Sequence, residues 1–407
     1  MMAKKKLLIT RYGKGILTGL LLDGKFVEIS YEPDREASLL DAIYVGRVSK
    51  MLKNVNACFV DIGIGQDCFF SMEDNPTPLF VKKYSKESIC VGDEFLVQVV
   101  KEAQKNKLPT VSSILQWKGR TMILTLGKGG VGISHKITGE RREELSRFFA
   151  DAVAETGGSD EDALDCDLPW GVIVRTNAQD AGEDDLLREW EELTERMKQQ
   201  IRTWVHAVTF HRVDQPEPSY ISFLKNTYRF SYEEILTDDA DIHAELMSYI
   251  RRYQPEDLPK LTLYEDPYPL EKLYSIEHQV SLALSPKVWL NSGAYIMIEH
   301  TEALTVIDVN SAKNVDRYNK KENHLRINKE AAVEIAKQLR LRNISGIIVI
   351  DFIDVSGTTQ EMIEFMKNCV KNDPVPTSVI DMTGLSLMEL TRKKIRKPLS
   401  EQMKYSE

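Results

Sequence analysis

Short apolar segments separated by turn-forming or charged residues fill the first third of the chain. Those between about residues 41 and 126 read AIYVGRVSKML, ACFVDIG, DCFFSM, EFLVQVVKEA and TMILTL. Five short strands within that length predict a small β-barrel. Before them, residues 7–33 also predict strands, with a hairpin turn at Asp23-Gly24 because both residue types tolerate positive φ.

The middle of the chain predicts one long amphipathic helix. Apolar residues that recur three or four positions apart lie on one face of a helix, and here they are Leu186, Trp190, Leu193, Met197, Ile201 and Trp204. That face needs a partner against which to pack. The stretch that follows, residues 206–283, mixes short strand and helix patterns and predicts no site.

The last part of the chain alternates strands with a helix. GAYIMIEHTEALTVIDVN predicts a pair of strands and GIIVIDFIDV a continuous apolar strand. One face of the intervening helix is marked by Ile327, Ala331, Ile335 and Leu339. Strand, helix and strand in this order predict a parallel βαβ unit with a right-handed crossover, so the fold class is α/β.

Two aspartates end the strands of this unit. In LTVIDVN the apolar run stops at Asp308, and in GIIVIDFID it stops at Asp351. The crossover places both carboxylates at the C-terminal edge of the sheet, with Asn310 on the same side, and open α/β sheets bind ligands at that edge. Two close carboxylates suit Mg²⁺, which takes one or two of them together with water and phosphate oxygens. The alternative is that each aspartate only forms a turn.

Aromatic residues lie on the polar face of two predicted barrel strands. The alternation in ACFVDIG places Phe59 beside Asp61, and in DCFF it places Phe69 beside Asp67. Exposed rings on a small barrel are candidates to stack on the bases of a single-stranded nucleic acid. The alternative is that a neighbouring domain covers them.

Composition narrows the classes of function. The net charge of −9 argues against a protein that coats nucleic acid non-specifically, so any such role depends on local patches. The five cysteines form no C-x-x-C pair, which favours a reducing cytoplasm. The basic opening MMAKKKLLITRYG has no apolar h-region, and no stretch is long enough to span a bilayer, so neither secretion nor a membrane location is expected.

Long segments of the chain resemble the ribonuclease E/G family. EHTEALTVIDVNSAK and AAVEIAKQLRLRNISGIIVIDFIDV are similar to its catalytic segments, and the resemblance extends from YVGRVSKMLKNVNACFVDIG to MELTRKK. It implies a catalytic set of Asp308, Asn310 and Asp351, in which the two aspartates bind Mg²⁺. Arg340 and Arg342 follow in the same segment, either as phosphate contacts or as part of a solvated helix face.

The resemblance also implies how RNA is held. Phe59 and Phe69 match the family's base-stacking aromatics, and Lys107 matches a basic residue beside the RNA. Arg175 and Thr176, in GVIVRTN, match a 5′-end sensor in which a guanidinium and a hydroxyl hold a terminal monophosphate. The forked donors of arginine fit phosphate oxygens well. Apart from the resemblance, such a pair is more often found on the surface at the end of a strand.

A multi-subdomain α+β architecture follows from the same resemblance. The expected parts are an RNase H-like subdomain in two pieces (1–38 and 216–283), an OB-fold RNA-binding domain (39–120), a 5′-sensor region (121–215) and a DNase I-like catalytic subdomain (284–407).

Two features depart from the family pattern. The C-P-x-C motif through which two subunits share a zinc ion is absent, so no zinc is expected, and any homodimer would form without a zinc-link. Gly384-Leu385-Ser386 stands where the family usually has Arg-Phe-Gly, which puts a phosphate contact near the metal in doubt. The absence of a long C-terminal tail resembles the shorter, ribonuclease G-like members.

The leading hypothesis is a cytoplasmic, Mg²⁺-dependent endoribonuclease that cleaves single-stranded RNA and leaves 5′-phosphate products. Stimulation by a 5′-monophosphate and a role in rRNA or tRNA processing or mRNA decay are expected. One alternative is a non-catalytic RNA-binding or ribosome-associated protein. Another is a metal phosphodiesterase that acts on DNA or a small phosphoester.

Overall fold

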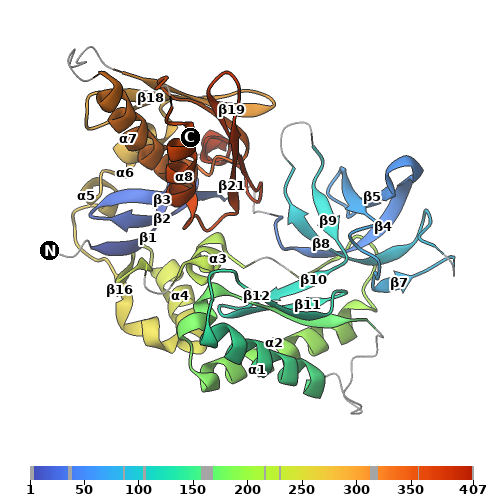
Figure 1. Cartoon of the computed structure of the whole chain (residues 1–407). Coiled ribbons are helices and arrows are strands. Elements are labelled where there is room, and N and C mark those ends of the chain that lie inside the picture. The colour runs from blue at the N-terminus through green and yellow to red at the C-terminus, as the bar shows by residue number, and fades with distance from the viewer. Residues whose placement is uncertain are drawn as a thin grey trace. The chain divides into compact units, whose positions relative to one another are not determined.

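The computed structural model divides the chain into two compact units (Figure 1). Unit 1 comprises residues 1–37, 232–247 and 257–407, and unit 2 comprises residues 38–231 and 248–256. The structure describes residues 4–34, 39–85, 88–103, 107–156, 168–214, 217–228, 231–311, 320–355 and 357–405. It confirms a mixed α/β architecture in which each unit combines segments that are distant in the sequence.

A five-stranded sheet in the order β16-β15-β1-β2-β3 belongs to unit 1. Its strands are β1 (Lys5–Tyr12), β2 (Gly15–Leu22), β3 (Lys25–Pro33), β15 (Glu234–Thr237) and β16 (Leu261–Leu263). The predicted hairpin turn between β2 and β3 is confirmed, because Asp23 and Gly24 have φ values of 50° and 77°. Apolar residues of α5 (Leu270–Leu273), α6 (Ile276–Leu284) and α9 (Leu399–Gln402) join its core.

The second sheet of unit 1 has six strands in the order β17-β18-β19-β20-β22-β21. They are β17 (Lys287–Trp289), β18 (Tyr295–His300), β19 (Leu304–Asn310), β20 (Gly346–Asp351), β21 (Thr377–Met382) and β22 (Leu387–Arg392). Helices α7 (Lys320–Leu341) and α8 (Thr359–Val370) pack on one side of it (Figure 1). The predicted βαβ unit is confirmed, because β19 and β20 are parallel neighbours joined through α7.

Alternating residues of these strands differ sharply in exposure. The predicted face of α7 (Ile327, Ala331, Ile335 and Leu339) is buried together with Ile348 and Ile350 of β20. Ile347, on the opposite face of β20, is 51% exposed. The continuous apolar pattern predicted for this strand would suit burial on both faces, but only one face is buried, because the helices cover one side of the sheet.

A closed β-barrel in unit 2 confirms the barrel prediction. Strands β4, β5, β6, β9 and β8 follow one another around it, and the pairing of β8 with β4 closes the ring. Its strands are β4 (Ile43–Leu52), β5 (Ala57–Asp61), β6 (Asp67–Ser71), β8 (Glu94–Lys101) and β9 (Thr110–Ser112), with β7 (Phe80–Lys82) and β14 (Arg212–Asp214) at its edges. Cys58 and Cys68 lie in the barrel core, where burial raises each thiol pKa to about 12.

One strand of the predicted barrel was assigned wrongly. TMILTL forms β11 (Met122–Leu126), which lies in a separate sheet of unit 2. The fifth barrel strand is instead β9, whose three residues include a single buried apolar side chain, Val111. So short a strand carries no periodic signal, and the pattern of a strand does not say which sheet it joins.

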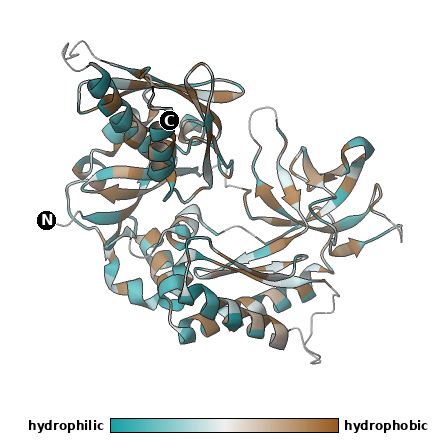
Figure 2. Cartoon of the chain, viewed as in Figure 1, coloured by the Kyte–Doolittle hydropathy of each residue, from teal (hydrophilic) through white to brown (hydrophobic). Residues whose placement is uncertain are grey.

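The separate sheet has the order β10-β11-β13-β12 and packs against two helices. Its other strands are β10 (Leu115–Lys118), β12 (Gly130–Ile133) and β13 (Trp170–Val174), and the helices are α1 (Glu140–Thr156) and α2 (Glu183–Trp204). All six residues predicted for one face of the long helix are buried on α2, at 5% exposure or less. Trp204 stacks on Trp117 of β10, with ring centroids 6.1 Å apart. Figure 2 shows apolar and polar residues interspersed along α2.

The remaining elements within the described residues are short helices, apart from α4. They are η1 (Lys53–Val55), η2 (Thr176–Asp180), α3 (Ser219–Asn226), α4 (Ala240–Tyr253), η4 (Pro255–Lys260) and η5 (Met403–Tyr405). Among the described residues, every helix is too short or too polar to cross a membrane.

Candidate functional site

Asp308 and Asp351 lie directly side by side at the ends of β19 and β20. Their Cα atoms are register partners in the parallel pairing of the two strands. Side chains alternate between the faces of a strand, and the buried neighbours Ile307 and Ile350 face the helices. Both aspartates therefore project from the opposite face, where Asp308 is half-buried and Asp351 is exposed.

Asn310 orients the first of these carboxylates. Its Nδ2 donates a hydrogen bond of 2.6 Å to Oδ2 of Asp308, and the two residues share a face because they are two positions apart on β19. The bond occupies one carboxylate oxygen and limits rotation of the group. The predicted grouping of Asp308, Asn310 and Asp351 is therefore present in the folded chain.

The donor set fits a hard divalent cation that keeps most of its own water. Within the described parts of the chain, no group of three His, Cys, Asp or Glu side chains is arranged to hold a metal. Mg²⁺ needs only one or two carboxylates, because water and substrate phosphate complete its six ligands. Asp308 and Asp351 match that requirement.

The turn between β21 and β22 lies beside this pair. Leu387, the first residue of β22, is the register partner of Asp351. The turn before it contains Ser386 with a left-handed φ of 63° and Leu385, which is 81% exposed. Oγ1 of Thr383 accepts the backbone N–H groups of Leu385 and Leu387. The run Gly384-Leu385-Ser386 thus forms a tight turn next to Asp351 with no cationic side chain.

The two arginines near the end of α7 are engaged within the fold. Arg340 forms an ion pair with Glu28 of β3 at 2.7 Å. Arg342 is buried and donates to Oε1 of Gln338 and to the carbonyl oxygen of Ser285, both at 2.6 Å. Burial lowers the pKa of Arg342 to about 10. Arg342 is therefore a buried structural residue and not part of a solvated helix face, while Arg340, whose side chain is 32% exposed, is held by its ion pair with Glu28.

On the barrel, Phe59 and Phe69 form a cross-strand pair. They are direct register partners in the antiparallel pairing of β5 with β6, and each is half-buried between neighbours that are fully buried. Lys50 of β4 is opposite Phe59 and extends the row. Lys107 is exposed and lies two residues before Pro109, whose carbonyl oxygen accepts the N–H of Phe69. The outer barrel face therefore presents two rings in a row with a lysine.

Arg175 and Thr176 follow β13, but their side chains have different partners. Arg175 donates to the carbonyl oxygen of Gly119 at 2.5 Å and to Oδ1 of Asn226 at 2.6 Å. The hydroxyl of Thr176 is 2.9 Å from that of Ser134, which follows the parallel neighbour β12. Burial lowers the pKa of Arg175, an effect that the Glu189 carboxylate opposes.

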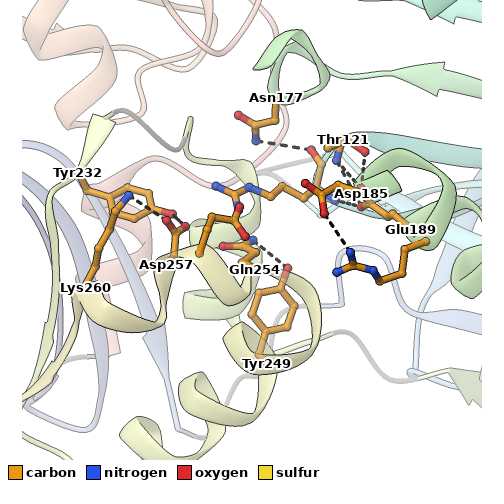
Figure 3. A network of polar contacts seen from close by, with 12 residues as sticks. Thr121, Asn177, Asp185, Glu189, Tyr232, Tyr249, Gln254, Asp257 and Lys260 are labelled. Carbon is orange, nitrogen blue, oxygen red and sulfur yellow. Dashed lines mark hydrogen bonds and ion pairs between the residues drawn. The ribbon is translucent and has the colours of Figure 1, made fainter. Parts of the chain in front are cut away.

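Glu189 of α2 is bound by the turn that holds Arg175. Its carboxylate accepts the backbone N–H groups of Arg120 and Thr121 and the hydroxyl of Thr121 (Figure 3). A side chain at Gly119 would collide with the carboxylate, since a Cβ there would lie 2.0 Å from Oε1 of Glu189. Burial raises the pKa of Glu189, while these hydrogen bonds oppose the rise. The turn is thus an anion cradle that the chain fills with its own carboxylate.

Several neighbours of these sites have no signal in the sequence. A bulge between Val48 and Lys50 shifts the register of β4, so simple alternation does not place Lys50 beside Phe59. Ser134 and Glu189 join the surroundings of Thr176 and Arg175 only through strand and helix packing, for which the sequence carries no local signal.

Comparisons with known proteins agree on one family. A sequence model described as the Ribonuclease E/G family matches residues 117–395. Ribonuclease G of Salmonella typhimurium is 30% identical over 398 residues, which cover 92% of this chain and 77% of that protein. Ribonuclease G of Escherichia coli strain K12 is 29% identical, covering 93% and 78%. Ribonuclease E of Synechocystis is 33% identical, covering 86% of this chain and 52% of that protein.

Proposed function

Because this chain belongs to the ribonuclease E/G family, we propose that it is a magnesium-dependent endoribonuclease of single-stranded RNA. The observation that carries the proposal is the direct pairing of Asp308 with Asp351, with Asn310 bonded to the first carboxylate. Processing of rRNA or tRNA, or decay of mRNA, is the cellular role that we infer for it.

Two carboxylates and one amide supply the chemistry at the strand ends. A bound Mg²⁺ would polarise the scissile phosphate and lower the pKa of an attacking water. Asp308 and Asp351 would hold it, and Asn310 keeps Asp308 in one orientation. In the reaction, the oxygen of water bonds to phosphorus and the bond from phosphorus to the 3′ oxygen breaks. The downstream product keeps a 5′-phosphate, and the upstream product gains a 3′-hydroxyl.

The barrel is the part that we assign to RNA binding. It is consistent with an OB-like fold, and Phe59 and Phe69 lie side by side where two bases can stack. Lys50, opposite Phe59, and Lys107 supply positive charge for the phosphate backbone of the bound RNA. This arrangement favours a single-stranded substrate, because the bases of a duplex stack on one another and leave no ring face free for Phe59 and Phe69.

A 5′-end sensor at Arg175 and Thr176 completes the proposal. The surroundings support it because Ser134, Arg175 and Thr176 lie at the adjacent ends of parallel β12 and β13. Arg175 would have to exchange its bonds with Gly119 and Asn226 for phosphate oxygens. The Arg175 side chain would thus switch between two states, one bonded to Gly119 and Asn226 and one bonded to the 5′-phosphate of RNA.

We also infer the subdomain pattern of the family for this chain. Residues 39–120 are the proposed OB-fold domain, 121–215 the sensor region and 284–407 the DNase I-like catalytic subdomain, with the two RNase H-like pieces at 1–38 and 216–283. The closed barrel and the two sheets of unit 1 support this division.

Cleavage of matched substrates tests the proposal. With Mg²⁺, the protein should cut a 5′-monophosphorylated single-stranded RNA oligomer and leave a DNA oligomer of the same sequence intact. Without Mg²⁺, both should remain whole, as resolved on a denaturing gel. RNA that is bound but never cut would identify a non-catalytic RNA-binding protein. Equal cleavage of DNA would identify a broader metal phosphodiesterase.

Changing Arg175 to Ala should remove the preference for a 5′-monophosphate. Charge-assisted bonds to phosphate are strong enough to give a preference of about tenfold or more. The ratio of kcat/KM for 5′-monophosphate RNA to that for 5′-hydroxyl RNA should therefore fall to about one. Arg188→Ala is the matched control, because Arg188 is an exposed arginine of the same unit paired with Asp185. An equal loss on both substrates would argue against a sensor.

A further inference from the structure

Phe210 has a backbone conformation that bulky residues rarely adopt. Its φ is 64°, and the residue is 37% exposed. Two backbone bonds hold the segment to β4, one from the N–H of Phe210 to Val45 and one from the N–H of Val45 to His211. A left-handed φ is unfavourable for a residue with a large side chain. Phe210 thus places an aromatic ring at the barrel surface although its backbone conformation is unfavourable for a bulky residue.

Gly63 makes room for this ring. A Cβ at Gly63 would lie 2.9 Å from the Cβ of Phe210, closer than a side chain can approach, and Gly63 itself has a φ of 82°. The N–H of Gly63 is held by Oδ1 of Asp61 at 2.8 Å. The turn after β5 is therefore shaped around Phe210.

Arg47 lies over the ring and is itself fixed. The guanidinium carbon is 5.1 Å from the ring centroid of Phe210. Two of its nitrogens donate to Oε1 of Glu94, at 2.8 and 3.0 Å, and one also contacts Oγ1 of Thr209 at 3.3 Å. Although burial opposes it, these bonds lower the pKa of Glu94, so the pair is charged at neutral pH. Guanidinium and ring form a preordered layer on which a flat group can stack.

This layer lies on the same outer face of the barrel as the two rings assigned to RNA. Arg47 is the register partner of Asp61, and Asp61 is two residues from Phe59 on β5. A two-residue step along a strand covers about 7 Å and returns to the same face. The layer of Arg47 and Phe210 thus continues the surface on which Phe59 and Phe69 lie.

The charges between them indicate which part of RNA faces this surface. Asp61 and Asp67 are register partners on the outer face. Two carboxylates repel the phosphate backbone but accept hydrogen bonds from the amino groups of bases. An RNA strand that crosses this face must therefore turn its bases toward the barrel, which is the orientation that stacking requires.

We propose that Phe210, with Arg47 stacked against it, is a third base-stacking position that extends the surface of Phe59 and Phe69. The ligand is an unpaired nucleobase of single-stranded RNA. This inference rests on the proposed function, because it assumes that RNA crosses this face of the barrel.

Binding of a 3′-fluorescein-labelled, 5′-hydroxyl RNA decamer tests the inference. Fluorescence anisotropy is measured without divalent cations, so that the RNA stays intact, and the 5′-hydroxyl leaves the sensor unused. Phe210→Ala and Phe210→Leu should each weaken binding about tenfold, because stacking requires a ring and not only apolar area. Phe210→Trp should bind as well as the original protein or better. Val208→Ala is the matched control, since Val208 is 72% exposed in the same segment.

The outcomes separate this inference from the proposed function. If Phe59→Ala weakens binding but Phe210→Ala does not, the third position is wrong and the RNA surface of the barrel stands. If neither variant weakens binding, both the inference and that surface are wrong. If Phe210→Trp loses as much affinity as Phe210→Ala, the residue has only a structural role, and thermal melting of each variant measures that role directly.

Discussion

Replacing Asp308 or Asp351 with asparagine is expected to reduce RNA cleavage about a thousandfold. The two carboxylates lie side by side at the ends of parallel strands and are the groups assigned to Mg²⁺. A catalytic metal contributes several kcal/mol of transition-state stabilisation, and about 4 kcal/mol corresponds to roughly three powers of ten in rate. Asparagine has the same shape, so each variant should stay folded. The measurement is kcat on single-stranded RNA at saturating Mg²⁺.

Two companion variants sharpen this result. Asp354→Asn changes the second aspartate of DFID, which is exposed and follows β20, and should leave kcat near its original value. Asn310→Ala removes the hydrogen bond to Oδ2 of Asp308 and should lower kcat about tenfold. The Asp308 carboxylate keeps its charge in this variant but loses the bond that orients it. Full activity in Asp308→Asn would mean that the assigned site is wrong.

Replacing Arg392 with methionine is expected to lower the free energy of unfolding of unit 1 by about 3–5 kcal/mol. Arg392 at the end of β22 donates to both carboxylate oxygens of Asp373, at 2.8 and 3.1 Å, and their side chains are 2% and 6% exposed. It also donates to Oδ1 of Asn343 and to the carbonyl oxygen of Ile344. The variant would leave the Asp373 carboxylate buried without its main partner. Equilibrium urea denaturation measures the loss.

The matched controls for Arg392 are an exposed pair and a double replacement. Arg188→Met breaks the ion pair with Asp185, in which both side chains are more than half exposed, and should change stability little. Arg392→Met combined with Asp373→Leu should recover much of the lost stability, because no unpaired buried charge remains. If Arg392→Met cost no more than Arg188→Met, the buried pair would not stabilise unit 1.

Local patterns predicted the elements better than their assembly. The apolar repeat of α2 and the strand alternation around Phe59 are properties of neighbouring residues, so both appear in the structure as predicted. TMILTL was predicted correctly as a strand but placed in the wrong sheet. The partner of a strand is chosen by residues distant in the sequence, and β9 joins β6 to β8 in the barrel with only three residues.

The candidate sites show the same difference. The crossover rule places Asp308 beside Asp351, because a right-handed βαβ unit leaves few other arrangements. No such rule applies to Arg175, whose partners Gly119 and Asn226 come from a turn and a helix far away in the sequence. Its present bonds could therefore be found only in the folded chain.

The sequence by itself determined most of the strands, the amphipathic helices and the resemblance to a ribonuclease family, because each depends on residues that are close along the chain. It also determined the pairing of Asp308 with Asp351, because the crossover rule for a βαβ unit extends that local pattern to two strands. Only the tertiary structure decided that one face of the β19–β20 sheet stays exposed, that Glu189 fills the turn beside Arg175, and that Phe210 lies against Arg47. These arrangements depend on contacts between residues that are far apart in the sequence, which no local pattern specifies.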